Sequence, residues 1–156
     1  MNSFLFLFAA LFMITGLRAQ PPKNKKPVVA QKFIPPKVSS FWGIRKDSTG
    51  TSVDEALQLL TIPFRVMDTN KNTYAISSYQ FLYRKIGIIE DEETGKTHTA
   101  STISSQQFRT TPLPRIWVKS ISEQLRTGEE LSLFDIVVKD NLGHLFFAPP
   151  IKIRIN

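Results

Sequence analysis

Hydrophobic and polar positions alternate most regularly at the C-terminal end of the chain. Ile151 to Ile155 is apolar at every odd position and basic at every even one, which is typical of a strand with one buried face. Upstream, the pattern predicts a strand over Leu131 to Lys139, a turn over Asp140 to Gly143 and a returning strand over His144 to Phe147. An alternating terminal strand needs a sheet to receive it, so we expect its isoleucines to be buried and its basic residues to face solvent.

The middle of the chain has the same β character. Phe64 to Met67 predicts a short strand, and Tyr74 begins a long one with apolar residues on odd positions. The apolar residues change parity beside Gly87, and again between Leu133 and Phe134. Because the side-chain period of a strand is two, one extra residue moves all later side chains to the opposite face. Both changes therefore predict a β-bulge.

A hairpin and an exposed edge strand follow. Glu90 to Lys96 is typical of a hairpin tip, with Gly95 where a positive φ is favoured. The segment from Thr97 to Thr111 is rich in Ser, Thr and Gln, which predicts an exposed edge strand. Free main-chain groups at such an edge can pair with a strand of another protein. The candidate partner-binding residues are Thr99, Ser101, Ile103, Ser105 and Trp117.

Two capping boxes predict two short helices. Ser52-x-x-Glu55 would begin the first helix, and Ser120-x-x-Glu123 the second, with Gly128 at the C′ position after it. Short strands, two short helices and bulges within one domain-sized length predict an all-β fold, a small antiparallel β-sandwich with two short helices.

The N-terminus has the pattern of an export signal. Phe4 to Leu17 is an apolar run of fourteen residues followed by a cleavage position at Ala19, which predicts a signal peptide over residues 1–19. Such a run is too short to span a bilayer core of about 30 Å. The chain has no cysteine, so it has neither a lipoprotein attachment site nor a disulfide. We expect an exported protein, periplasmic or secreted to the cell surface, without a membrane span.

Residues 20–40 form the next segment, rich in proline and lysine. From Gln20 to Lys46 there are seven basic residues, no acidic residue and five of the ten prolines, a composition that predicts an extended linker. Two interpretations stay open: a solvated spacer, or a basic arm that touches an anionic surface. Nucleic acid is excluded as a partner because no aromatic residues alternate with these basic ones. The folded domain is expected over residues 41–156.

Three segments between Ile62 and Asn156 resemble the C-terminal periplasmic domains of the GldM family, the shaft protein of the gliding-motility and type IX secretion motor. The matching motifs are Tyr74-x-Ile76-x-Ser78-Tyr79, Leu125-x-x-Gly128-Glu129-x-Leu131-x-Leu133-x-x-Ile136 and Pro150-Ile151-x-Ile153-x-Ile155. The resemblance implies an immunoglobulin-like sandwich in a bacterial envelope that binds envelope proteins, accessory to gliding, type IX secretion or surface assembly. The family's transmembrane helix is not among the matched segments, so the shaft role itself is not carried over.

No arrangement of residues predicts catalysis. His98 and His144 are expected on the surface, and the consecutive acids Glu90 to Glu93 lack the spacing of a calcium loop. No Gly-x-Ser-x-Gly elbow surrounds a serine. We therefore expect no enzyme activity, cofactor or metal. The leading hypothesis is a protein–protein interaction module, with homodimerisation left open. The alternative is a carbohydrate- or cell-wall-binding module that uses the basic arm and exposed aromatic residues, with Trp117, Tyr79 and Tyr83 on its binding face.

Overall fold

The computed structural model describes residues 32–46 and 48–156, without the side chain of Ser48. The signal peptide and the linker up to residue 31 lie outside the described residues. Phe33 to Asn156 form one compact unit. Its elements are β1 (Val38–Trp42), β2 (Arg45–Lys46), β3 (Ser48–Thr51), α1 (Val53–Thr61), β4 (Phe64–Asp68), β5 (Thr73–Glu90), β6 (Thr97–Phe108), α2 (Arg115–Ser122), β7 (Glu130–Lys139), β8 (Leu145–Ala148) and β9 (Ile151–Ile155).

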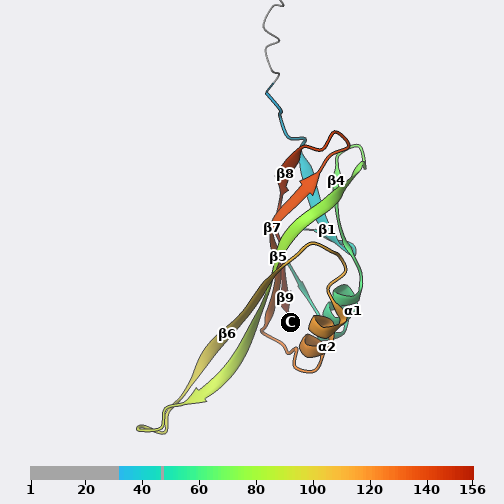
Figure 1. Ribbon diagram of the computed structural model, residues 1–156. Coiled ribbons are helices and arrows are strands. Elements are labelled where there is room, and N and C mark those ends of the chain that lie inside the picture. The colour runs from blue at the N-terminus through green and yellow to red at the C-terminus, as the bar shows by residue number, and fades with distance from the viewer. Residues whose placement is uncertain (1–31, 47) are drawn as a thin grey trace, which may run out of the picture. The chain divides into compact units, whose positions relative to one another are not determined.

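The strands form one sheet that folds back on itself (Figure 1). Nine described strands follow the order β2-β1-β4-β5-β7-β9-β3, with β6 on β5 and β8 on β7, in a barrel-like sandwich that is nearly closed. The expected all-β class with two short helices is confirmed. The sheet is mixed and not wholly antiparallel, because β3 pairs with β9 in parallel.

The terminal strand β9 is built into the core as expected. Ile151, Ile153 and Ile155 are 0%, 0% and 1% exposed, and they pack among the buried residues of the other strands. Lys152 was expected to face solvent, but its side chain also forms an ion pair, with its Nζ 2.9 Å from the Oε1 of Glu130. The Glu130 side chain is buried, so this ion pair neutralises a charge that the fold has taken out of water.

The bulge predicted in β7 is present. From Gln80 to Ser78 on β5 the partner strand advances from Phe134 to Val137, and Asp135 at this step has a φ of 47°. On one side of the bulge β7 pairs with β9, and on the other side it pairs with β8. The extra residue thus marks the point where β7 changes neighbours, and it keeps apolar residues inward on both sides.

The bulge predicted in β5 lies elsewhere. The register of β5 against β6 runs without interruption through Gly87, whereas the shifts against β7 fall between Ile76 and Gln80. The prediction at Gly87 was wrong because it assumed that Ile86 and Ile88 belong to the core. Both side chains are exposed, so their parity carries no information about burial.

One predicted helix start is confirmed and the other is wrong. The Ser52 hydroxyl accepts a hydrogen bond from the Glu55 N–H at 3.3 Å, so Ser52 caps α1. Helix α2 begins at Arg115, directly after Pro114, and Ser120 lies inside it. Proline before the first turn positions the chain for a helix without needing a capping side chain. Gly128 lies in the turn that leads into β7, and its N–H donates to the Ile155 carbonyl at 2.8 Å.

The folded unit also begins earlier than Phe41, the boundary expected from the sequence. Val38 is buried in β1, and the Ser40 hydroxyl donates to the Pro149 carbonyl at 2.6 Å. The Phe33 ring stacks on the ring of His144, with centroids 4.3 Å apart. The last part of the expected linker is therefore a strand and its lead-in segment.

Candidate docking surface on the β5–β6 hairpin

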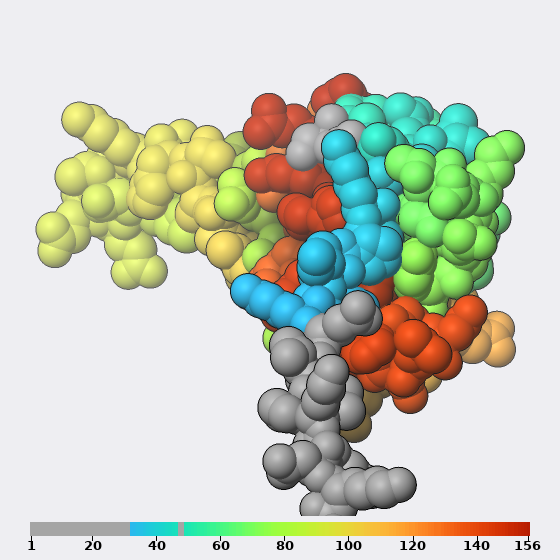
Figure 2. Space-filling view, turned by 90° about the horizontal axis from the view of Figure 1, so that it is seen from above, coloured from blue at the N-terminus to red at the C-terminus, as the bar shows by residue number. Residues whose placement is uncertain are grey.

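The outer half of the β5–β6 hairpin stands clear of the core (Figure 1). Pairing between β5 and β7 ends at Arg84 opposite Glu130, whereas pairing with β6 continues to Glu90 opposite Thr97. Beyond Arg84, therefore, the described strands give β5 no neighbour except β6. Figure 2 shows the same projection from above, in yellow and lime. Its tip is the predicted turn, with Gly95 at a φ of 67° and its N–H donating to the Asp91 carbonyl at 2.8 Å.

Isoleucines on this ribbon are exposed on both of its faces. Ile86, Ile88 and Ile103 lie on one face with exposed fractions of 38%, 78% and 55%, and Ile89 lies on the other with 51%. A two-stranded ribbon in water gains nothing from such side chains, and isolated hairpins are marginally stable. Four of the eleven exposed large apolar side chains of the described residues lie on this one projecting element, which indicates a contact surface.

The ribbon has two distinct faces, which we call the groove face and the outer face. The groove face carries Lys85, Gly87, Ile89, His98, Ala100 and Thr102, and the outer face carries Arg84, Ile86, Ile88, Thr99, Ser101 and Ile103. Of the residues predicted for partner binding, Thr99, Ser101, Ile103 and Ser105 lie along β6 on the outer face. Trp117 comes from α2 and packs on the groove side, so the structure does not bring all five together.

A groove runs between the root of the hairpin and α2. It has a volume of about 670 Å³ and is lined by Tyr83, Lys85, Gly87, Thr102, Ser104, Ile116, Trp117, Ser120, Ile121 and Gln124. Trp117 meets the rings of Phe81 and Phe108 edge to face, and its indole N–H donates to the Gln106 side chain at 3.1 Å. Among the described residues that line the groove, Lys85 is the one charged residue, and its Nζ donates to Gln124 at 2.9 Å. The groove therefore combines an apolar wall with an uncompensated cation.

Gly87 leaves a flat spot beside this groove. A Cβ added there would meet no atom within 4 Å, and the φ of Gly87 is not in the left-handed region. Neither sterics nor backbone conformation in the described unit requires glycine at this position. Glycine weakens a strand, and in a strand interior it often marks a place where another backbone approaches.

A buried carboxylate holds the root of the hairpin. Glu129 is 1% exposed, and it accepts hydrogen bonds from the Tyr83 hydroxyl at 2.5 Å, the Arg126 N–H at 3.0 Å and the Ile86 N–H at 3.2 Å. The last bond gives β5 an acceptor just where β7 stops pairing with it. Burial first, and then the bond to Glu129, raise the pKa of Tyr83. Both carboxylate oxygens of Glu129 accept hydrogen bonds from groups of the fold, so Glu129 serves as a structural anchor and not as a general base.

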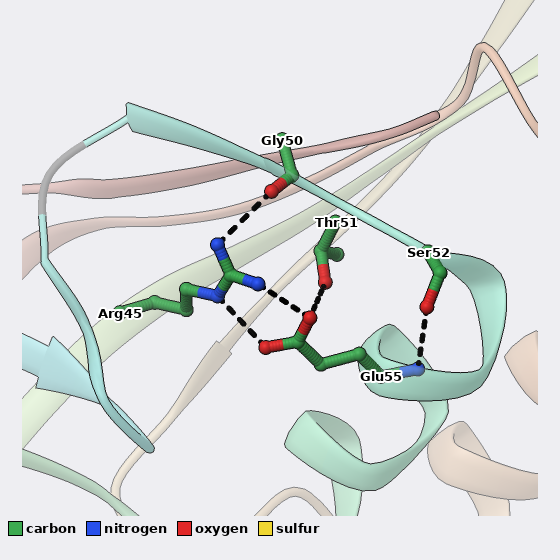
Figure 3. Close-up of polar contacts among 5 residues, drawn as sticks. All are labelled: Arg45, Gly50, Thr51, Ser52 and Glu55. Carbon is green, nitrogen blue, oxygen red and sulfur yellow. Dashed lines mark hydrogen bonds and ion pairs between the residues drawn. The ribbon is translucent and has the colours of Figure 1, made fainter.

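The polar cluster between β2, β3 and α1 is also structural (Figure 3). The Arg45 guanidinium donates hydrogen bonds to both carboxylate oxygens of Glu55, with its Nε 2.8 Å from Oε1. It also donates to the Gly50 carbonyl at 3.1 Å. The Thr51 hydroxyl donates to the same carboxylate at 2.5 Å. The bond from Arg45 first, and then that from Thr51, lower the pKa of Glu55. Each group is satisfied by its neighbours, and the cluster ties the short strands to the helix.

The histidines and tip carboxylates lie on the surface, as the sequence suggests. Both histidines are exposed; His144 is hydrogen-bonded to Asp140 at 2.8 Å. Over residues 32–46 and 48–156, no three metal-binding side chains come together, and no helix is long and apolar enough to cross a membrane. The aromatic residues of the alternative hypothesis are not displayed, because Tyr79 and Tyr83 are buried and Trp117 is half-buried.

Comparisons with known proteins add no assignment. No protein-family model matches the chain, and no curated protein matches it. The resemblance to the GldM family, with the secretion and gliding roles that it implies, therefore stays a prediction.

Sequence reasoning found the edge strand but missed the groove and the projection. A signal was present: Ile86, Ile88 and Ile89 occupy both parities of a strand whose partner strand is rich in Ser and Thr. A strand with apolar residues on both faces and a polar neighbour cannot bury them within a single sheet. That conflict indicates a projecting element better than it indicates a bulge.

Proposed function

We propose that the protein is a non-catalytic, exported interaction module that docks on a protein partner in the cell envelope through the β5–β6 hairpin. One observation carries this proposal: the hairpin leaves the core at Arg84 with free main-chain edges and four exposed isoleucines. A strand added to such an edge gains main-chain hydrogen bonds, while neighbouring apolar side chains supply specificity. Export, and a role accessory to gliding motility, type IX secretion or surface assembly, are part of the same proposal.

The contact that we favour uses the free edge of β6. In the described unit β6 pairs with β5 alone, and from Thr97 to Gln107 its residues are exposed or half-buried, so none of them belongs to the buried core. The outer-face residues Ile88 and Ile103 lie beside this edge, where an added strand could cover them.

A matched pair of substitutions at Ile103 tests this proposal. Ile103→Pro removes the main-chain N–H and stiffens the strand, whereas Ile103→Thr keeps the N–H and the branched shape. Immobilised wild-type protein should retain a partner from envelope extracts, identified by mass spectrometry. The proline variant should lose that partner and the threonine variant should retain most of it, with unchanged melting temperatures in both.

Two outcomes would reject this proposal. Equal capture by wild type and the proline variant would exclude the β6 edge as the docking site. Wild-type binding to purified peptidoglycan or soluble glycans, without a protein partner, would favour the carbohydrate- or wall-binding alternative. No exposed row of tryptophan or tyrosine in the described residues supports that alternative.

A further inference from the structure

The two ends of the projecting hairpin carry opposite charge. Four consecutive acids, Glu90 to Glu93, form the tip with a single nearby base, Lys96. The root carries Arg84 and Lys85 on adjacent positions of β5. No ion pair among the described residues includes any of these side chains. The backbone N–H of Thr94 first, and then that of Glu93, lower the pKa of Asp91, so this carboxylate is charged near neutral pH.

The groove face also carries a projection and a depression at matched positions. Ile89 is half exposed, whereas Gly87 and its partner Ala100, one step nearer the root, offer almost no side chain. Every second residue from Lys85 to Ile89 lies on the same face of β5, so this face carries Lys85, Gly87 and Ile89 in that order. Along this face the order from tip to root is therefore acid, isoleucine, glycine and lysine.

We propose that two copies of this chain dock hairpin against hairpin, groove face to groove face and antiparallel, with the acidic tip of each at the Lys85 groove of the other. Lys85 and Asp91 are six positions apart, a separation of roughly 20 Å along a strand. A two-fold axis midway between them aligns Lys85 with Asp91 of the second copy, and Gly87 with its Ile89. Each contact then occurs twice, as an isologous interface requires.

Charge and shape select this arrangement over the alternatives. A parallel arrangement would place two clusters of four acids together, where like charges repel one another. The antiparallel arrangement places each acidic tip at Lys85, and the described residues that line the groove include no acid. It also gives Gly87 a role, since Ile89 of the second copy fills the space above it.

The interface should be weak. A ribbon two strands wide covers less than the roughly 800 Å² per partner of a standard interface. We expect a dissociation constant of about 10 to 100 μM, sensitive to salt because the ion pairs are exposed at the rim. This inference concerns a second copy on the groove face and does not depend on the foreign partner proposed for the β6 edge.

Sedimentation equilibrium of the mature chain, from about 5 μM to 1 mM, tests the docking arrangement. The wild type should dimerise, and dimerisation should weaken about tenfold for Lys85→Glu and for the pair Glu92→Lys and Glu93→Lys. A mixture of these two variants should restore part of the association, because each supplies the charge that the other lacks. Gly87→Leu should abolish dimerisation by filling the depression, while Ile88→Ser on the outer face should leave it unchanged.

Several results would overturn the docking arrangement. A wild type that stays monomeric at 1 mM would do so, as would a dimer that Lys85→Glu and Gly87→Leu leave intact. A monomer whose Lys85 captures a different acidic protein would replace the second copy by that foreign partner. Ile103→Pro separates the two proposals, because it should remove partner capture at the β6 edge and leave the dimer in place. Circular dichroism spectra and melting temperatures equal to wild type would show that all variants are folded.

Discussion

The same residue type has opposite environments in two strands of this protein. In β9 the three isoleucines are at most 1% exposed, whereas those of the outer hairpin range from 38% to 78%. Both segments have high β propensity and both form regular ladders. The difference lies in what covers them. Strand β9 lies between β7 and β3, and its isoleucine face packs into the core, whereas in the described part of the chain the outer ribbon has two strands and no second layer.

This contrast separates two uses of apolar surface in one domain. Burial of an isoleucine stabilises a fold by about 1.5 to 3 kcal/mol, so the β9 side chains hold the sandwich together. The hairpin isoleucines, which are 38% to 78% exposed, contribute much less of this kind to the monomer. These isoleucines would be buried more fully only if another molecule covered them. For this reason we propose the hairpin as the functional surface.

The contrast is sharpest in a pair of alanine substitutions. Ile153→Ala should lower the free energy of unfolding by about 3 to 4 kcal/mol, because it leaves a cavity in the core. Ile88→Ala should change it by less than about 0.5 kcal/mol, because the side chain is exposed. Urea unfolding followed by circular dichroism measures both values. Similar effects at the two positions would mean that the hairpin is part of the core.

Truncation tests where the folded unit begins. A chain that starts at Phe33 should be as stable as the mature protein, whereas one that starts at Phe41 loses buried Val38 and the Ser40 bond to Pro149. We expect the shorter chain to lose about 2 to 3 kcal/mol, mainly from the burial of Val38 and the lost ladder to β4. Thermal unfolding compares the two. Equal stability would restore Phe41 as the boundary.

Lys152→Ala tests the exposed side of β9. Removal of the ammonium leaves the buried Glu130 carboxylate without its ion-pair partner, which should cost about 1 to 2 kcal/mol. The variant with Glu130→Gln added should recover most of this loss, since the buried charge is then gone. A cost below about 0.5 kcal/mol for Lys152→Ala alone would show that the pair behaves as an ordinary surface ion pair.

The Arg45 and Glu55 cluster predicts a small dependence of stability on acid pH. Because the pKa of Glu55 is lower in the folded state, its ion pair stabilises the fold above the unfolded pKa of about 4.3. That contribution is lost as the pH falls through the lower, folded value. Melting temperatures from pH 7 to pH 2 should therefore fall less steeply for Glu55→Gln than for wild type. Parallel curves would show that the cluster contributes nothing.

Regular alternation made much of the sandwich predictable from the sequence. Strand β9 and the β7 bulge follow from side-chain period, which is a local property with a direct consequence for burial. The turn before β8 follows from its turn-forming residues. The start of α2 could not be predicted from its capping box, because Ser120 and Glu123 satisfy the pattern while Pro114 sets the true beginning. Nor does local pattern reveal that β3 pairs in parallel with β9, since that pairing joins segments about a hundred residues apart.

The candidate site was predictable only in part. Composition indicates that β6 is an exposed edge, but the groove depends on how α2 packs against the hairpin root through Trp117 and Phe81. Those are tertiary contacts between distant segments. The groove face and the outer face could be assigned only once the register of β5 against β6 was known.

The most direct test of the central claim is to shorten the hairpin. Replacement of Ile88 to Thr99 by an Asn-Gly turn joins Gly87 to Ala100, which are partners in the ladder, and keeps the Ile86 N–H for Glu129. The account predicts a folded protein that melts within about 2 °C of wild type, by the small effect expected at exposed sites, and that neither dimerises nor captures a partner. Loss of the fold, or retention of both associations by the shortened protein, would contradict it.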